Sequence, residues 1–336
     1  MEPIRVGIMG FGHIGRQLYQ LASNRDDVAV VAVSDVGAPD ILHHLLTRDM
    51  RSPPSRLVGN HLDNGRFTTR MLRTDQPREV PWDAFGVDAV VDATGRFRSR
   101  ADMQAHLDNG APRVVISSLP LDHVDRVVMP GINTASARAE DRMISAGSAS
   151  TTATALVLHA LTARFRIAFA TMTSVHAYTS DQSLQDYAGA DYRRSRSGAE
   201  NIIPNTTDAP FWVEHVLPTL AGKLSGYALN VPVQRGSLLD LSVAFDDPGV
   251  GVEDVNAAMR DAASHMPALL GIADDPIVSS DVIGATYSAL FDLRATLKAG
   301  RRMIKTLSWH ESLGHAHRIL DVLHGYAAID TRGAWS

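Results

Sequence analysis

The feature that most constrains the fold is a glycine-rich segment near the start of the sequence. An apolar run from Ile4 to Ile8 leads into Gly10, Gly12 and Gly15, and a helical pattern follows. In this context the first glycine permits a tight turn, the second lets the backbone approach a pyrophosphate, and the third lets the helix pack on the strand. The N-H groups and the dipole at the start of the helix favour phosphate charge. The segment therefore predicts the first strand-turn-helix unit of a dinucleotide-binding domain.

An acidic residue at the end of the next strand indicates which dinucleotide is bound. The apolar run from Val28 to Val33 ends at Asp35, which falls twenty residues after Gly15. A carboxylate at this place can accept hydrogen bonds from both ribose hydroxyls and repels a 2'-phosphate. The sequence therefore favours NAD over NADP.

Further apolar runs extend this domain, and the pattern changes after about residue 150. The runs at 89–91 and 113–118 alternate with helical stretches, which is typical of a parallel, doubly wound sheet. Alternating segments at 168–175, 225–233 and 237–245 instead predict the strands of a mostly antiparallel sheet.

The same second half contains a long loop and a closing helix. Residues 178–210 are polar and without periodicity, and a long loop inside a compact domain is usually functional. The periodic stretch 317–328 predicts a helix. We expect an α/β chain with a Rossmann NAD-binding domain over 1–148, an α+β catalytic domain over 149–314, and a C-terminal helix over about 315–336 that packs back on the first domain.

The composition excludes several functions. A chain of 336 residues is long enough for two domains, and a net charge of -5 gives no reason to expect a nucleic-acid partner. No stretch approaches the roughly 18 apolar residues of a membrane span and no cleavable signal is evident, so we expect a cytoplasmic protein without a membrane partner. The sequence has no cysteine, which excludes disulfides, zinc-thiolate sites and cysteine nucleophiles, and we expect no metal site.

The chain resembles the glyceraldehyde-3-phosphate dehydrogenase family over nearly its whole length. Six ordered motifs carry the resemblance: Gly10-Phe11-Gly12-His13-Ile14-Gly15-Arg16, Ala93-Thr94-Gly95-Arg96-Phe97, Ser174-Val175-His176-Ala177-Tyr178-Thr179, Asn201-Ile202-Ile203-Pro204, Gly222-Lys223-Leu224-Ser225-Gly226 and Ser279-Ser280-Asp281. The resemblance implies NAD as cofactor, a small-molecule substrate, a catalytic domain with an arginine-bearing loop, and a homotetramer. The cofactor-binding candidates are Gly10, Phe11, Gly12, His13, Ile14, Gly15, Asp35, Thr94, Gly95, Ser117 and Ser312.

The family's nucleophile is missing. Its cysteine thiolate adds to the aldehyde, hydride leaves the thiohemiacetal, and a thioester remains for phosphate to attack. The family motif Ser-Asn-Ala-Ser-Cys-Thr-Thr-Asn-Cys corresponds without gaps to residues 145–153, which places Ala149 at the nucleophile position. The family's catalytic histidine lies twenty-seven residues beyond the cysteine, and twenty-seven residues beyond Ala149 is His176.

A second register makes Ser150 the replacement by aligning Ser150, Thr151 and Thr152 with Cys-Thr-Thr, but it needs compensating gaps. An alkoxide is also far harder to generate near neutral pH than a thiolate. His176 ends an apolar strand, a place suited to acid-base catalysis or to hydrogen bonding a carbonyl oxygen. The alternative for His176 is an inherited histidine that only fills its site.

Both anion pockets of the family are altered. The resemblance implies a substrate-phosphate pocket made of a threonine and an arginine. Thr179 is kept, but Asn230 replaces the arginine and lacks its charged guanidinium group. In the second pocket, which binds inorganic phosphate in the family, Asp208 replaces a glycine, and its carboxylate would repel phosphate. Arg194 and Arg196 match loop arginines that serve an anionic substrate or the subunit interface. The substrate-binding candidates are Ser148, Ser150, Thr151, Thr179, Arg194, Thr207, Asp208 and Asn230.

The segment that clamps the nicotinamide also departs from the family. Residues 308–314 read Ser-Trp-His-Glu-Ser-Leu-Gly where the family has Ser-Trp-Tyr-Asp-Asn-Glu before its glycine, so the clamping asparagine is missing. Ser312 is the candidate at this place. The adenosine half of the dinucleotide site therefore remains, while the nicotinamide half and the nucleophile are changed.

Three hypotheses follow from this pattern. The first is an enzyme repurposed for direct hydride transfer to another small molecule, or one for which a nicotinamide nucleotide is itself the substrate, with His176 as acid or base. The second is a catalytically silent NAD-binding paralogue that acts as a sensor or an assembly subunit. The third is an aldehyde dehydrogenase in which Ala149 replaces a natural cysteine by engineering.

Overall fold

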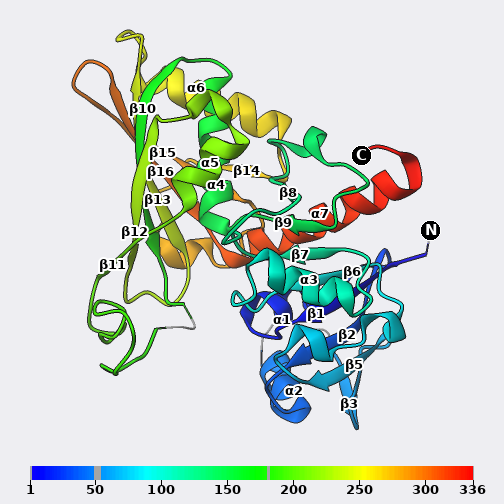
Figure 1. The fold of residues 1–336 in the computed structure, drawn as a ribbon. Coiled ribbons are helices and arrows are strands. Elements are labelled where there is room, and N and C mark those ends of the chain that lie inside the picture. The colour runs from blue at the N-terminus through cyan, green and yellow to red at the C-terminus, as the bar shows by residue number, and fades with distance from the viewer. Residues whose placement is uncertain (1, 49–53, 180–181, 336) are drawn as a thin grey trace. The chain divides into compact units, whose positions relative to one another are not determined.

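The computed structural model describes residues 2–48, 54–179 and 182–335. Contacts within the chain divide it into two compact units (Figure 1). Unit 1 comprises Met1–Gly147 together with Ala316–Ser336, and unit 2 comprises Ser148–His315.

Within its described residues, unit 1 contains a sheet of nine strands in the order β3-β4-β5-β2-β1-β6-β7-β9-β8. In the sheet order, all neighbouring strands from β5 through β2, β1, β6, β7 and β9 to β8 pair in parallel. At the other edge β3 and β4 form an antiparallel hairpin, and β4 pairs antiparallel with β5. The elements are β1 (Ile4–Met9), α1 (His13–Ser23), β2 (Val28–Asp35), α2 (Pro39–Thr47), β3 (Arg56–Val58), β4 (His61–Asp63), β5 (Thr68–Arg73), β6 (Ala89–Asp92), α3 (Arg100–Asp108), β7 (Val114–Ile116), β8 (Arg126–Val127), β9 (Met143–Ser145) and α7 (Ser312–Arg332), whose residues from Ala316 onward belong to unit 1.

The core of unit 1 explains why the apolar runs become central strands. Val6, Ile8, Val30 and Val33 are buried at 2% exposure or less, as expected for parallel strands covered on both faces. The apolar stripe of α7 completes this core, with Ile319 among the buried residues. The expected Rossmann domain with a parallel sheet is confirmed.

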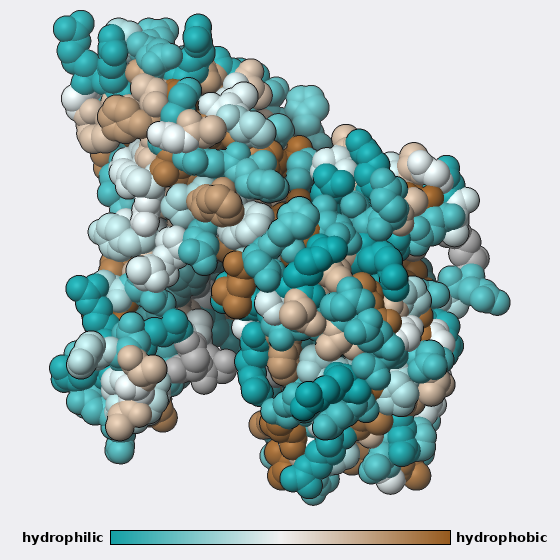
Figure 2. Space-filling model, viewed as in Figure 1, coloured by the Kyte–Doolittle hydropathy of each residue, from teal (hydrophilic) through white to brown (hydrophobic). Residues whose placement is uncertain are grey.

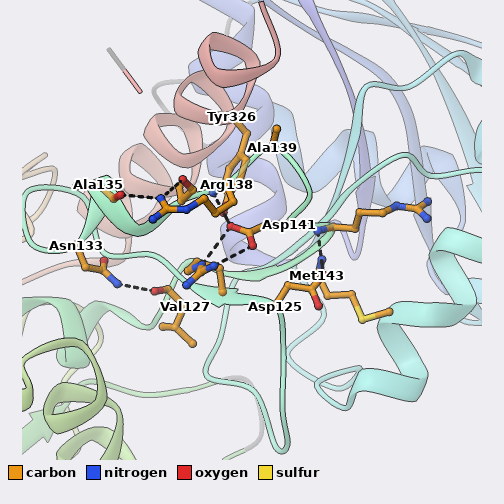
Figure 3. Close-up of polar contacts among 12 residues, drawn as sticks. Asp125, Val127, Asn133, Ala135, Arg138, Ala139, Asp141, Met143 and Tyr326 are labelled. Atoms are coloured by element: carbon orange, nitrogen blue, oxygen red, sulfur yellow. Dashed lines mark hydrogen bonds and ion pairs between the residues drawn. The ribbon is translucent and has the colours of Figure 1, made fainter. Parts of the chain in front are cut away.

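A buried carboxylate ties α7 to the sheet of unit 1 (Figure 3). Asp141 accepts hydrogen bonds from Nε and Nη2 of Arg126, both at 3.2 Å, from the amide of Arg138 at 2.8 Å, and from the hydroxyl of Tyr326 at 2.8 Å. The guanidinium of Arg113 lies 4.6 Å from the centre of the Tyr326 ring, a distance typical of cation-π attraction. Since Tyr326 belongs to α7, this cluster anchors the last helix by polar contacts as well as by packing.

Within its described residues, unit 2 contains a sheet of seven strands in the order β11-β12-β10-β13-β16-β15-β14. Four of its six strand pairs are antiparallel, so the expected mostly antiparallel sheet is confirmed. The elements are α4 (Ala149–Thr162), β10 (Ile167–His176), β11 (Ile203–Asn205), α5 (Ala209–Val216), β12 (Leu224–Asn230), β13 (Ser237–Phe245), α6 (Val252–His265), β14 (Leu270–Ala273), β15 (Ala289–Ala299) and β16 (Met303–His310). Figure 1 shows α4, α5 and α6 on one face of this sheet.

Three element boundaries differ from the sequence expectation. The last helix is longer than 317–328, because the carboxylate of Glu311 accepts the amide of Leu313 at 3.0 Å and caps its start. β12 ends at Asn230 rather than at residue 233, since Pro232 has no N-H to donate to a ladder. The loop 178–210 contains the short strand β11 and the start of α5. Residues 180–181 of this loop, like Ser336 of the expected C-terminal helix, lie outside the described residues.

The hydropathy of the surface gives no sign of a large apolar patch among the described residues on the face that Figure 2 draws. The face drawn in Figure 2 is mostly hydrophilic, with hydrophobic side chains scattered over it. Among the described residues, every helix is too short or too polar to cross a bilayer.

Candidate functional site

The glycine turn of unit 1 joins β1 to α1. Gly10 has a φ of +89°, and a Cβ added to it would lie 2.9 Å from the amide nitrogen of Thr94. A Cβ on Gly15 would lie 2.1 Å from the carbonyl oxygen of Gly10. At Gly12 no described atom lies within 4 Å of an added Cβ, so the backbone there is open to a ligand. Each glycine thus meets the steric requirement that its place in the motif predicts.

The start of α1 is suited to a pyrophosphate. Gly12 provides no side-chain cap, and the first turn of the helix has no acidic residue. The positive end of the helix dipole is therefore not compensated by a carboxylate of the helix itself. Of the neighbouring candidates, His13 is exposed and Ile14 is half-buried. These features fit the phosphates of a dinucleotide.

Asp35 connects the end of β2 to the glycine turn. Its Oδ2 atom accepts the amide of Phe11 at 2.6 Å, and its Oδ1 atom accepts the amide of Gly37 at 2.8 Å. A carboxylate has about four acceptor positions, so two remain for ribose hydroxyls. The side chain of Phe11 is buried and contacts the ring of Tyr19 edge-on, with centroids 5.7 Å apart. The side chain of Phe11 therefore supports the turn from the core and is not available to a cofactor.

Thr94, Gly95 and Ser117 follow the ends of β6 and β7, the next strands of the same parallel sheet. Gly95 has a φ of +68°, and the amide of Ser117 donates to the carbonyl of Asp92 at 2.9 Å. The chain passes from β1 to β2 on one side, and β6 lies on the other side of β1, so the strand order reverses here. Ligands of open α/β sheets bind at such a switch point. The structure thus brings the candidates of unit 1 to one edge of the sheet.

In unit 2, four polar side chains lie in a row across neighbouring strands. His176 at the end of β10 pairs in register with Asn230 at the end of β12. On its other side, Ser237 at the start of β13 pairs with His310 at the end of β16. The amide of Ala177 donates to Oγ of Ser237 at 3.3 Å. We call Asn230, His176, Ser237 and His310 the histidine edge.

The imidazole rings of His176 and His310 lie next to each other in the histidine edge. Their centroids are 6.1 Å apart and their planes meet at 73°. Burial lowers the pKa of His176. Burial, and then the positive charges that His176 and His315 can carry, lower the pKa of His310 to about 3. Both rings are therefore neutral near pH 7, and a neutral imidazole can accept a proton.

Next to His176, a neutral hydrogen-bonding cluster occupies the end of β12. Oε1 of Gln182 accepts the amide of Thr179 at 3.0 Å, the hydroxyl of Thr179 at 3.2 Å and Nδ2 of Asn230 at 2.8 Å. The side chain of Asn230 is buried, at 5% exposure. The predicted substrate residues Thr179 and Asn230 thus come together, around an amide oxygen that the sequence did not reveal.

The start of α4 lies at the same end of unit 2 as the histidine edge. Residues 163–166 connect α4 tightly to β10, so helix and strand run in opposite directions. Oγ1 of Thr154 lies 3.6 Å from Sδ of Met172, four residues before His176 and on the same face of β10. The beginning of α4 and the end of β10 therefore point the same way.

Side chains at the start of α4 distinguish the two candidate replacements for the nucleophile. Ala149 is the first helical residue and is half-buried, whereas Ser150 is buried at 6% exposure. Ser148 caps the helix and accepts the amide of Thr151 at 3.3 Å, and the hydroxyls of these two residues lie 2.7 Å apart. Oγ of Ser150 is 3.4 Å from Oγ of Ser148. The three hydroxyl groups thus form one cluster beside the methyl group of Ala149.

The remaining candidates lie in separate turns of unit 2. Oγ1 of Thr207 accepts the amide of Ala209 at 3.2 Å, and exposed Asp208 precedes α5. The amide of Arg194 donates to Asp191 at 2.9 Å within the polar loop. Oγ of Ser312 donates to Glu311 at 3.2 Å. Among the described residues, no group of three or more His, Asp or Glu side chains is placed to hold a metal ion.

Sequence reasoning missed Gln182 and Ser237 and treated His310 only as a departure from the family. Gln182 lies in a segment without periodicity, so no sequence signal indicated it. Ser237 and His310 stand at strand ends, and the register of the antiparallel pair formed by 237–245 and 303–310, two segments distant in the sequence, would have placed them beside His176.

Together these features define a class. A parallel sheet with a glycine turn at its switch point, followed in the chain by a mostly antiparallel unit with a partly buried histidine at a strand end, characterises NAD-binding proteins of the two-domain dehydrogenase type.

Comparison with known proteins identifies the family. Residues 4–100 match the family description "Glyceraldehyde 3-phosphate dehydrogenase, NAD binding domain", and residues 148–312 match its C-terminal domain. The chain is 38% identical over 331 residues to glyceraldehyde-3-phosphate dehydrogenase of Haloarcula vallismortis, covering 96% of this chain and 97% of that protein. It is 39% identical over 335 residues to the protein of the same name from Geobacillus stearothermophilus, with 95% and 97% covered. The chain belongs to the glyceraldehyde-3-phosphate dehydrogenase family, and it binds NAD.

Proposed function

We propose that this chain is an NAD-dependent oxidoreductase that acts on a small molecule without a covalent thioester, with His176 as the acid-base group. One observation carries the proposal: a sequence without any cysteine has a half-buried alanine at the start of α4 and a neutral histidine at the adjacent strand end. Thioester chemistry requires a thiolate at such a place. Direct hydride transfer requires only positioning and a group that takes or gives a proton.

The proposed role of His176 rests on its surroundings. NAD, when bound, supplies the group that accepts or delivers a hydride. Because burial lowers its pKa, His176 is neutral near pH 7 and can take the proton of a substrate hydroxyl; the resulting imidazolium can return it to an oxygen in the reverse direction. Asn230 on one side and Ser237 on the other fix the strand ends that carry it.

The proposed substrate differs from glyceraldehyde-3-phosphate. Asn230 and Thr179 offer hydrogen-bond donors to the amide oxygen of Gln182, and Asn230 brings no positive charge. A phosphate dianion is best bound by an arginine fork, whereas neutral donors suit a carbonyl, hydroxyl or amide oxygen. Exposed Asp208 adds negative charge before α5. We therefore expect a substrate without a phosphate group.

The position of Ala149 supports the same proposal. A first-turn residue that is half-buried can face a ligand, and the helix dipole there would favour a thiolate if a cysteine were present. Ser150 instead lies buried within the Ser148–Thr151 hydroxyl cluster, which disfavours it as a nucleophile.

The proposed assembly is a homotetramer in the cytoplasm. The sheet face of unit 2 opposite to α4, α5 and α6 exposes Phe169, Tyr227, Leu297 and Met303. Register places Phe169 and Met303 in one row, on either side of Ala244. An uncovered sheet face with several large apolar side chains is typical of a subunit interface. Sedimentation velocity tests this proposal, and a monomer at micromolar concentration would contradict it.

Turnover measurements test the proposed reaction. The purified protein is incubated with NAD or NADH and with aldehydes, ketones, alcohols and imines that lack phosphate; nicotinamide absorbance and mass spectrometry report products, including any change in the nucleotide itself. We expect turnover that falls about 10²- to 10⁴-fold in His176→Gln. His265→Gln, at an exposed position of α6, is the matched control and should be unchanged.

Three results would redirect the assignment. Equal turnover in His176→Gln would remove the proposed role of that residue. Tight NAD binding without turnover of any substrate would support a silent sensor or assembly subunit. Oxidation of glyceraldehyde-3-phosphate to the acyl phosphate at ordinary rates would refute the proposal.

The natural gene sequence decides whether Ala149 is native or replaces a cysteine. Ala149→Cys should make the start of α4 reactive toward thiol-directed alkylation.

A further inference from the structure

A series of buried hydrogen bonds ends at the edge of the unit 1 sheet that carries the cofactor-binding candidates, which we call the cofactor edge. Nε1 of Trp82 donates to Nδ1 of His106 at 3.0 Å, and Nε2 of His106 lies 3.2 Å from Oδ2 of Asp92. Oδ1 of Asp92 accepts the amide of Thr94 at 2.9 Å and its hydroxyl at 2.6 Å. Trp82, His106 and Asp92 are each exposed by 2% or less.

The chemistry of the groups determines which one donates and which one accepts in each of these hydrogen bonds. An indole N-H can only donate, so Nδ1 of His106 is the acceptor and the ring proton is on Nε2. Nε2 then donates to Asp92, which accepts from three donors in all, one from His106 and two from Thr94. Loss of the His106 donor would leave a buried carboxylate oxygen without its partner, which is costly.

The Thr94 end of this series of hydrogen bonds lies against the glycine turn. Gly10 and Thr94 approach so closely that a Cβ on Gly10 would come within 2.9 Å of the amide nitrogen and of Cγ2 of Thr94. The amide of Ala93 donates to the carbonyl of Met9 at 2.7 Å, and the amide of Arg96 donates to Oγ1 of Thr94 at 3.1 Å. The hydroxyl of Thr94 therefore links Asp92 to the outward turn at Gly95.

The order of the strands indicates which part of the dinucleotide this turn meets. Asp35, placed to bind a ribose, ends β2, and the glycine turn for the pyrophosphate follows β1. Since β6 lies on the other side of β1, the half of a bound dinucleotide beyond the pyrophosphate would extend over the end of β6. Thr94 and Gly95 stand at that end.

We infer that His106 is a positioning residue for the nicotinamide half of NAD, which acts through Asp92 to hold the Thr94–Gly95 turn at its distance from Gly10. His106 itself is buried on α3 and does not touch the cofactor. The inference depends on NAD binding alone and not on the proposed reaction. Its failure and the failure of the proposed reaction are therefore distinguishable.

Calorimetric titration of the full chain with NAD and with AMP tests the inference, because AMP occupies only the half over β2 and β1. We expect His106→Leu to raise the Kd for NAD about tenfold and to leave the Kd for AMP within about twofold. His106→Gln can place an N-H near the position of Nε2, and it should bring the Kd for NAD back to within about threefold of the wild type.

Two outcomes would overturn the inference. One is equal weakening of NAD and AMP binding in His106→Leu, which a general structural defect would cause. The other is unchanged NAD binding in a folded His106→Leu protein. If His106→Leu does not fold, Asp92→Asn replaces it: an asparagine amide has one acceptor oxygen and cannot accept from Thr94 and from Nε2 of His106 at the same time, so the same loss confined to NAD is expected. Unchanged NAD binding in Asp92→Asn would refute the inference.

Discussion

The buried imidazole of His310 should make the protein acid-sensitive in a way that one substitution removes. Its ring is buried beside His176, and Nε2 is without a hydrogen-bond partner among the described residues. The folded protein keeps this ring neutral down to about pH 3, because burial and the charges of His176 and His315 oppose protonation. In the unfolded chain a histidine titrates near pH 6.5.

The sign and size of the effect follow from this difference in pKa. Between about pH 6.5 and pH 3 the unfolded chain binds a proton that the folded chain does not, so the free energy of unfolding decreases as the pH falls. The contribution of neutral His310 to the free energy of unfolding is complete above pH 6.5. Below pH 6.5 the free energy of unfolding falls by about 1.4 kcal/mol per pH unit. From pH 7 to pH 5 the loss due to His310 is about 2 kcal/mol.

Urea denaturation of the wild type and of His310→Phe at the two pH values measures this quantity. The substitution keeps an aromatic ring of similar size and removes the titration. Fluorescence of Trp309, the neighbouring residue on β16, contributes to the signal from unit 2. We expect the wild type to lose about 2 kcal/mol more than His310→Phe between pH 7 and pH 5. Exposed His265→Phe serves as the control.

The reasoning fails if His310→Phe loses as much stability on acidification as the wild type does. A difference below about 0.5 kcal/mol would mean that the His310 ring is protonated in the folded protein at pH 5, through contact with water or with a carboxylate.

Other contacts lead to further expected outcomes. Gly15→Ala places a methyl group 2.1 Å from the carbonyl oxygen of Gly10, so α1 must shift and calorimetry should show loss of NAD binding; an unchanged Kd would refute the steric argument. Tyr326→Phe removes the hydroxyl donor to buried Asp141 and should lower the free energy of unfolding by about 1–2 kcal/mol in urea titrations; no change would mean that the other donors suffice. Asp35→Ser should raise the affinity for NADP relative to NAD about tenfold or more, and unaltered selectivity would remove the proposed ribose contact.

Local patterns predicted the cofactor edge well, because its requirements are local. The glycine turn needs only small residues at fixed spacing, and Asp35 follows directly from the end of an apolar strand. The sheet types of both units also followed from the period of apolar residues.

The sequence did not predict the contacts that depend on distant segments. His310 and Ser237 approach His176 through strand pairing across more than sixty residues. His106 on α3 reaches Asp92, and Trp82 in a short helical turn reaches His106; nothing in their own sequence neighbourhoods indicates these contacts. Gln182 turns toward Asn230 from a loop without periodicity. Such contacts need tertiary register, which spacing alone does not supply.

The methyl group at the start of α4 has a practical consequence. Enzymes that depend on an activated thiol are inactivated by peroxide, which oxidises the sulfur through sulfenic to sulfinic acid. A site with Ala149 in that place, in a sequence of 336 residues without one cysteine, offers peroxide no sulfur at the helix start. The activity proposed for this chain should therefore persist under oxidative conditions that inactivate thiol-dependent enzymes.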